Sequence, residues 1–206
     1  DKKQAERPTV HGQQYMGDES QHRKLAPAED TLRSREPDIL AAQTHLEEGR
    51  VSEAMALLKL ATERRPDDPD AHYWLGRSQQ EDGRFDLAAP SMLRAVAIDP
   101  DFASAWKGVA TSFVLQRRCE DAMEALDRYV ELKPDDAGGY YNRGGCRYQA
   151  GDREGSLEDG KKACEMGMPM ACRVVEKQQR HQQVTDAMSR EREAQKTAEG
   201  STGGPE

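Results

Sequence analysis

Three prolines divide the middle of this chain into equal steps. Pro66, Pro100 and Pro134 stand 34 residues apart, and each closes a stretch with the same order of small, apolar and polar residues. A 34-residue period with small side chains at fixed places is typical of a solenoid built from pairs of antiparallel helices. This period limits the possible folds more than any single motif in the chain does.

Small residues recur at the same places in each block. The blocks 35–68, 69–102, 103–136 and 137–170 align without a gap. Their eighth, twentieth and twenty-seventh positions hold, in block order, Ala42, Gly76, Ala110 and Gly144; Ala54, Ala88, Ala122 and Ser156; and Ala61, Ala95, Tyr129 and Ala163. Helices that cross closely need small side chains at the crossing, because a large one forces the backbones apart. The pattern predicts helix pairs stacked on one another.

The second block carries a recognisable set of residues. These are Trp74, Leu75 and Gly76 in the first helix, Gly83 at the turn, Phe85, Ala88, Met92 and Ala95 in the second helix, and Asp99 with Pro100 at its end. In these features residues 36–168 resemble the tetratricopeptide repeat (TPR) proteins. The resemblance implies an all-α fold of four helix–turn–helix repeats, wound into a right-handed superhelix.

The other three blocks depart from the family pattern at informative places. Asp38 stands where the first block should have an aromatic residue, and Arg117 occupies a turn position that usually holds glycine. The fourth block has Ser156, Leu157 and Gly160 where alanine and a large apolar residue are expected. We therefore expect a fourth repeat that is present but divergent.

The first 35 residues differ in character from the repeats. Residues 1–35 hold few apolar side chains, so burial cannot offset the entropy lost on ordering them. We expect a largely unstructured polar segment that forms at most a short helix over residues 27–33, where a proline and acids suit a first helical turn.

The last part of the chain predicts one long helix. Residues 169–197 contain good helix formers and no internal glycine or proline after the first residue. A solenoid needs such a polar-backed helix to shield its last apolar face. The side chains expected to face inward are Met170, Val174, Val175, Val184 and Met188. Residues 198–206 are expected to form a flexible tail.

The negative charge is concentrated in the repeats. Residues 36–175 hold 18 Lys+Arg against 26 Asp+Glu, which accounts for the whole formal charge of -8. A nucleic-acid site needs clustered Lys and Arg, so no nucleic-acid partner is expected. Acidic outer faces that keep a repeat protein soluble are one interpretation, and a basic partner is the other.

Two cysteines lie eight residues apart across an expected helix–turn–helix junction. The segment around Cys164 and Cys172 resembles the Sel1-like repeats, whose paired cysteines bridge one helix to the next. That resemblance implies a Cys164–Cys172 disulfide, and two small buried thiols are the alternative. A disulfide at this place indicates an oxidising compartment, either the periplasm or the cell exterior. Of the remaining cysteines, Cys146 is expected to be buried and Cys119 partly exposed.

The sequence offers no catalytic pattern. A zinc-protease His pair with Glu, a glycine-rich phosphate loop, a Cys-x-x-Cys pair and a nucleophile elbow are all absent from the 206 residues. The paired acids Asp67-Asp68 and Asp135-Asp136 follow the repeat-ending prolines, where helix capping explains them. We therefore expect no enzyme, cofactor, metal or small-molecule substrate.

What the TPR resemblance implies instead is a binding groove. In the family, four positions of each first helix line the concave side. Carried onto this chain, the expected partner-binding residues are Ile39, Gln43, Tyr73, Arg77, Gln80, Lys107, Thr111, Tyr141 and Tyr148, with Leu46 and Val114 beside them. Tyrosine offers an apolar face with a hydroxyl, and Arg77 and Lys107 offer cations to carboxylates or carbonyls. Ile39 and Gln43 replace the Lys and Asn of the chaperone-binding members, which argues against an acidic chaperone tail as ligand.

Two classes of function follow. The first is a protein–protein interaction module that holds a peptide or partner segment in the groove. The second is a structural or assembly factor of a bacterial envelope complex, such as a pilotin-like lipoprotein, with membrane contact only through a lipid anchor upstream of Asp1. The expected location is the periplasm or cell envelope, with the cytoplasm as the alternative.

Overall fold

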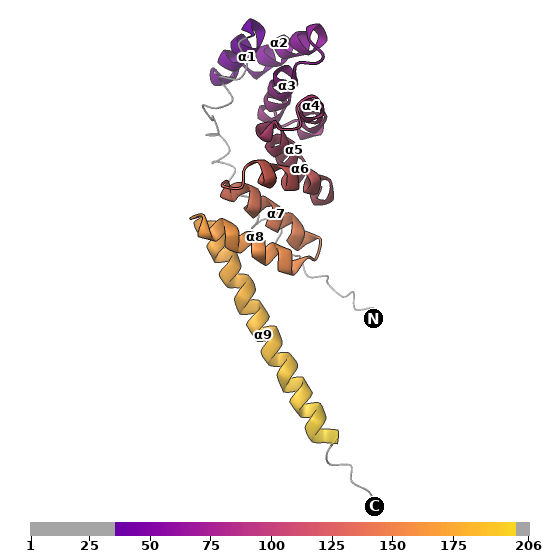
Figure 1. Cartoon of the computed structure of the whole chain (residues 1–206), viewed down its shortest axis with the longest axis vertical. Coiled ribbons are helices and arrows are strands. Elements are labelled where there is room, and N and C mark those ends of the chain that lie inside the picture. Colours follow the sequence, from indigo (N-terminus) through magenta and orange to yellow (C-terminus); the bar gives the residue numbers. More distant parts are fainter. Residues whose placement is uncertain (1–35, 201–206) are drawn as a thin grey trace, which may run out of the picture. The chain divides into compact units, whose positions relative to one another are not determined.

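The computed structural model of the chain describes residues 36–200, apart from the side chains of residues 194 and 196–200. These residues form nine helices and no strand (Figure 1). In chain order they are α1 (Pro37–Glu47), α2 (Val51–Arg64), α3 (Pro69–Glu81), α4 (Phe85–Ile98), α5 (Ala103–Leu115), α6 (Cys119–Leu132), α7 (Ala137–Gln149), α8 (Arg153–Glu165) and α9 (Pro169–Gly200). The predicted all-α fold of helix pairs is confirmed. The short helix expected over 27–33 and residues 201–206 lie outside the described residues.

The chain divides into two compact units, Asp1–Lys133 and Pro134–Glu206. Helices α1 to α6 belong to the first unit, and helices α7 to α9 belong to the second. The division therefore falls after the third of the four repeats.

Aspartates begin the first helix of two repeats. The Asp68 carboxylate accepts hydrogen bonds from the backbone N–H groups of Asp70 (3.0 Å) and Ala71 (3.3 Å) at the start of α3. Asp136 accepts one from Gly138 (2.8 Å) at the start of α7. These acids satisfy backbone donors that the first helical turn leaves unpaired, as the sequence predicted.

The turn inside each helix pair needs one residue with a left-handed backbone. Gly83 adopts φ 74° between α3 and α4, and Arg117 adopts φ 60° at the equivalent place between α5 and α6. A side chain makes this conformation unfavourable by about 1 kcal/mol relative to glycine. Arg117 therefore replaces the usual glycine, and the chain still adopts the same left-handed turn.

The core of the first unit is built around small residues. Ala54, Ala61, Ala88, Ala95 and Ala122 are all fully buried, in agreement with the aligned small positions. Close helix crossings leave room only for such side chains.

Met92 joins three helices of this unit. Its fully buried side chain lies on α4 and packs against Gly76 of α3 and Gly108 of α5. A Cβ atom added at Gly108 would overlap the Met92 side chain, with the methyl carbon only 2.7 Å away. A glycine at this place therefore allows the second repeat to dock on the third.

The second unit contains α7, α8 and the first turns of α9. Tyr141, Ala163 and Ala171 form its buried apolar cluster, and Met170 and Val174 pack against that cluster. Val175 is also buried. The early part of α9 thus faces inward as expected.

The later part of α9 does not face inward. Val184 is 58% exposed and Met188 is 52% exposed, so their expected burial is wrong. Figure 1 shows α9 continuing past α7 and α8, which leaves these side chains without a neighbouring helix in the described part of the unit.

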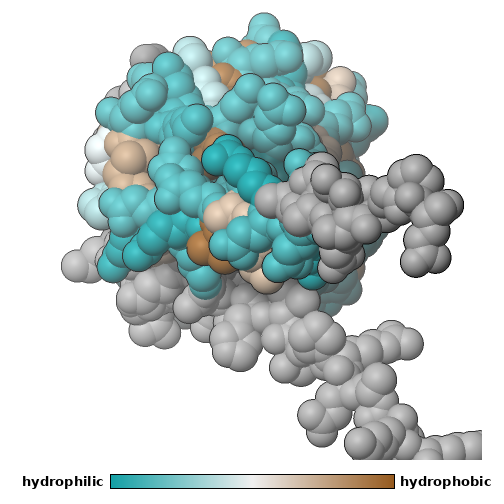
Figure 2. Space-filling view, turned by 90° about the horizontal axis from the view of Figure 1, so that it is seen from below, coloured by the Kyte–Doolittle hydropathy of each residue, from teal (hydrophilic) through white to brown (hydrophobic). Residues whose placement is uncertain are grey.

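The face of the molecule drawn in Figure 2 is mainly polar. Hydrophilic residues cover most of the face shown in Figure 2, and hydrophobic residues gather there only in small separate patches. Over residues 36–200, no helix has both the length and the apolar character that crossing a membrane requires.

Candidate partner-binding surface

The first helices of the repeats lie side by side in the first unit. Helix α1 contacts α3, and α3 contacts α5. Gln80 ties the second pair together, because its amide nitrogen donates to the Gly108 carbonyl (2.9 Å) and to the Ser112 hydroxyl (2.8 Å). Helices α3 and α5 therefore present a surface with a fixed register.

Two cations stand on these neighbouring helices. Arg77 on α3 has 23% of its side chain exposed and lies 3.5 Å from the Glu81 carboxylate. Lys107 on α5 is half-buried, with its ammonium nitrogen 5.3 Å from the centre of the Tyr129 ring. Thr111 follows one turn later on α5 and is also half-buried. This set can orient a carboxylate or a backbone carbonyl.

Three of the expected groove residues in this unit are packed inside it. Ile39 is fully buried, Gln43 is 6% exposed and Tyr73 is 2% exposed. The Tyr73 ring lies 5.3 Å from the Trp74 ring and 4.8 Å from the Phe102 ring, between ring centres. Tyr73 is therefore a core residue, and the expectation that its ring presents an open apolar face is corrected. Leu46 and Val114 are half-buried.

The other expected residues, Tyr141 and Tyr148, belong to α7 of the second unit. Tyr141 is 9% exposed and sits in the apolar cluster of that unit, so it too packs inside. Tyr148 is half-buried, with the Arg153 guanidinium 5.1 Å from its ring centre. In the second unit, Tyr148 is the more accessible of the two rings.

A buried ionic cluster in the second unit was missed by the sequence analysis. The Asp159 side chain is 4% exposed and pairs with Arg143 through two contacts of 2.7 and 2.9 Å and with Arg147 through one of 3.0 Å. A signal for it was present, because Arg143 takes the block position that holds Leu75 and Val109 in the two preceding blocks. A cation at an apolar position, with an acid on the facing helix, indicates a buried pair.

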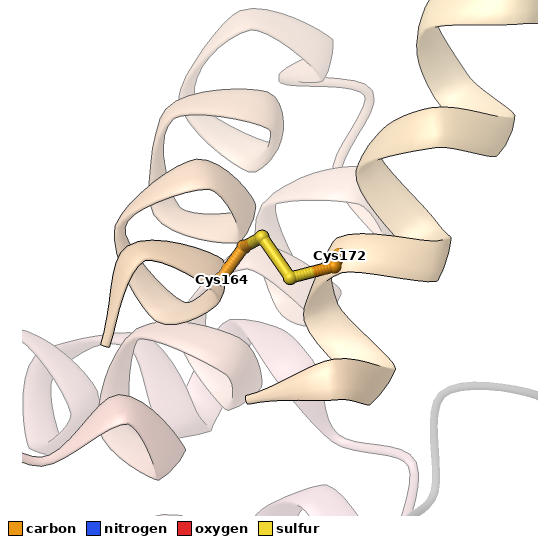
Figure 3. Close-up of a disulfide and its surroundings, with 2 residues drawn as sticks. All are labelled: Cys164 and Cys172. Atoms are coloured by element: carbon orange, nitrogen blue, oxygen red, sulfur yellow. A yellow bond between two sulfur atoms is a disulfide. The ribbon is translucent and has the colours of Figure 1, made fainter. Parts of the chain in front are cut away.

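The structure joins Cys164 and Cys172 by a disulfide (Figure 3). The sulfur atoms lie 1.96 Å apart and the α-carbons 4.7 Å apart, which is within the range that a disulfide spans. The bond links the end of α8 to the first turn of α9. The resemblance to Sel1-like repeats stays a prediction. Cys146 is buried as expected, whereas Cys119 is 8% exposed and thus buried, in contrast to the expected partial exposure.

The described side chains include no group of three or more His, Cys, Asp and Glu placed to hold a metal ion. Helices α3 and α5 carry two cations, an amide and a hydroxyl on a rigid helical support. The fold defines a protein built from helical repeats.

The family follows from comparison with known proteins. The family described as tetratricopeptide repeat matches residues 39–103 and 108–171, which is more than half of the chain. The chain belongs to the tetratricopeptide repeat family.

Solved structures share this fold at low sequence identity. A MamA fragment from Desulfovibrio magneticus RS-1 is 18% identical, with a TM-score of 0.65 over 80% of this chain and 94% of that one. Another MamA structure is 22% identical, with a TM-score of 0.60 over 63% of this chain and 75% of the other. YrrB, described as a TPR protein with an unusual peptide-binding site, is 21% identical, with a TM-score of 0.60 over 66% of this chain and 72% of YrrB. These likenesses concern the fold.

Proposed function

We propose that this protein is a non-catalytic interaction module that holds a peptide or partner segment along α3 and α5. The observation that carries the proposal is a set of half-buried polar side chains on two helices locked in register. The set consists of Arg77, Gln80, Lys107 and Thr111. The peptide-binding site attributed to YrrB, a protein of similar fold, supports the same use of the repeats.

The chemistry of this surface favours an extended segment with a carboxylate. Both amide hydrogens of Gln80 are used within the protein, so its carbonyl oxygen is the group left to accept a backbone N–H from a ligand. Arg77 and Lys107 attract negative charge and increase the rate of association more than the final affinity. Side chains that are already held in place lose little entropy on binding.

The test compares two charge reversals in the full chain. Arg77→Glu with Lys107→Glu changes the surface, and Arg94→Glu with Arg128→Glu makes the same charge change on second helices, at an exposed and a half-buried position. Partners are captured from native extract on wild-type protein and identified by mass spectrometry. We expect the first pair to lose a partner that the second pair keeps.

Equal capture by both double variants would place the partner elsewhere. Loss of capture only on removal of residues 170–196 would place it on α9. Circular dichroism of each variant separates lost binding from lost helix.

A second candidate function is a structural or assembly factor of a bacterial envelope complex, for example a pilotin-like lipoprotein. The Cys164–Cys172 disulfide favours it, because such bonds persist in the periplasm and outside cells. Peptide mapping without reductant, on protein made in its native compartment, tests this location. Linked peptides containing Cys164 and Cys172 are expected, and free thiols at both positions would remove the support for a periplasmic or envelope location.

A further inference from the structure

The first repeat exposes a largely apolar face that the next two repeats bury. One side of α1 is open to solvent, and Leu40 on that side is 42% exposed. At the same places of the next two blocks the residues are buried, because α2 packs on α3 and α4 packs on α5. Among residues 36–200 no helix precedes α1, so no second helix covers its face. The places compared are Pro37, Leu40, Ala41 and Thr44 in the first block, Ala71, Trp74, Leu75 and Ser78 in the second, and Ala105, Gly108, Val109 and Ser112 in the third.

Helix α2 adds a second large apolar side chain on the same side of the repeat. Leu60 is 46% exposed. The equivalent position of the next two blocks holds Arg94 and Arg128, and each reaches back to an acid of the preceding block, Asp67 at 3.6 Å and Asp101 at 2.9 Å. This position therefore points toward the preceding repeat. A leucine offers nothing to an acid, so the group that meets Leu60 is apolar.

The two leucines belong to one continuous patch. The Arg64 guanidinium lies 3.3 Å from the Asp38 carboxylate, which places the start of α1 beside the end of α2. Leu60 lies one turn before Arg64 on α2, and Leu40 and Ala41 lie in the turn that follows Asp38 on α1. In an antiparallel pair these two turns are neighbours. We call this patch on α1 and α2 the end face.

We infer that a second copy of this chain covers the end face, with the end faces of the two copies packed on each other about a two-fold axis. Such a contact needs a surface that complements itself, and an apolar patch does so. The charges at its border also permit the contact. Arg64 pairs with Asp38 and Arg65 pairs with Glu36 (3.3 Å), so the border is neutral although the chain has a formal charge of -8. Two copies therefore meet at this face without the repulsion that their acidic faces would cause.

The expected dimer is weak and stops at two copies. Helices α1 and α2 have 11 and 14 residues. They are thus about 16 and 21 Å long and about 10 Å wide, so the paired faces bury roughly 800 Å² in total. Stable interfaces bury about 1,200–2,000 Å², which places this dimer in the micromolar range or weaker. The last repeat is already covered, because α9 packs on α8. A two-fold contact uses the end face of both copies, so larger assemblies are not expected.

The first experiment measures self-association of the full chain by sedimentation velocity over a range of concentrations. We expect a monomer–dimer equilibrium in which Leu60→Glu raises the dissociation constant by about tenfold or more, because each dimer contains the change twice. Leu93→Glu is the matched control, since Leu93 on α4 is 40% exposed and lies outside the end face. The control should keep the wild-type constant. Equal constants for the two variants would overturn the inference, as would a wild-type chain that stays monomeric at every concentration. The second of these results would leave the end face to another protein or to the residues before Glu36.

The second experiment tests direct contact between two end faces. One variant carries Leu40→Glu with Leu60→Glu, and the other carries Leu40→Lys with Leu60→Lys. Each variant alone should be monomeric, because like charges face each other, and an equimolar mixture should form a dimer that added salt weakens. Circular dichroism verifies that both variants keep the helix content of the wild type. A mixture of folded variants that stays monomeric would overturn the inference, and so would a dimer that either variant forms alone as readily as the wild type.

Discussion

The two units of this protein solve the same packing problem with different chemistry. In the first unit, helix pairs meet through small and apolar residues, with Met92 fitted against Gly76 and Gly108. In the second unit, Arg143 and Asp159 meet between α7 and α8. A disulfide then fastens α9 to α8.

The difference teaches how a divergent repeat can keep its fold. Close packing of apolar side chains depends on many weak contacts. Small shifts therefore cost little stability, whereas an added large side chain destabilises the core. A buried ion pair depends on a few strong contacts, and losing one partner leaves an unpaired charge. We therefore expect added bulk to destabilise the first unit and loss of a charged partner to destabilise the second. The following changes test that contrast, from the largest expected effect to the smallest.

Removing the buried acid should be the most damaging single change. Asp159→Ala leaves Arg143 and Arg147 without their shared partner and should cost about 3 kcal/mol of unfolding free energy. Chemical denaturation measures it. Glu158→Ala, at an exposed neighbour, should be nearly neutral.

A second variant tests whether the unpaired charge causes the loss of stability in Asp159→Ala. Arg143→Leu combined with Asp159→Ala restores the apolar residue that Leu75 and Val109 supply in other blocks, and it should be less destabilising than Asp159→Ala alone. A double variant as unstable as the single one, or less stable than it, would show that the ionic cluster is not what distinguishes the second unit.

The disulfide should matter next. Cys164→Ala with Cys172→Ala removes a link across a separation of 8 residues and should cost about 2–3 kcal/mol. Hydrogen exchange should quicken at the junction of α8 and α9 and stay unchanged in α3, because coupling in solenoids is between neighbours. Equal loosening of α3 would contradict coupling that is limited to neighbouring helices.

Added bulk should affect the first unit more gently. Ala88→Leu places a large side chain at a fully buried helix crossing and should cost about 1–3 kcal/mol. Ala97→Leu makes the same change at an exposed position of the same helix and serves as the control. Equal thermal midpoints for the two variants would mean that the small positions do not set the spacing of the helices.

The smallest effect is expected on the outer part of α9. Val184→Lys with Met188→Lys alters two side chains that are more than half exposed, so stability should change by no more than about 0.5 kcal/mol. A larger loss, seen in denaturant unfolding, would mean that this part of the helix is packed in solution.

The sequence predicted the helices well because their spacing is a local property. The 34-residue period placed Ala88 and Ala122 at buried crossings, and the turn at Arg117 formed without glycine. Burial that depends on a distant partner was harder to predict. Tyr73 is enclosed partly by Phe102, which lies at the end of its block. The position of Tyr73 in the repeat predicted that it lies in the groove. That position does not determine how much of its side chain is exposed to solvent.

The second unit shows a different limit of sequence reasoning. Arg143 and Asp159 are 16 residues apart, and neither alone signals a buried pair. Met188 was expected to face inward because the helical periodicity continues along α9. Its side chain is exposed because this part of α9 extends beyond the helices that pack against its start. Periodicity tells which side of a helix is apolar but not whether anything lies against it.

Helix α9 has a mechanical consequence. Its base is held by the Cys164–Cys172 bond and by the Gln178 amide, which donates to the Ser156 hydroxyl at 3.2 Å. From Gln178 to the helix end at Gly200 the rise is about 33 Å. A rotation of about 5° at the base would sweep the tip through roughly 3 Å by the geometry of a rod of that length. The helix is thus a lever, and a small change of angle at α8 becomes a displacement large enough to make or break a contact far from the repeats.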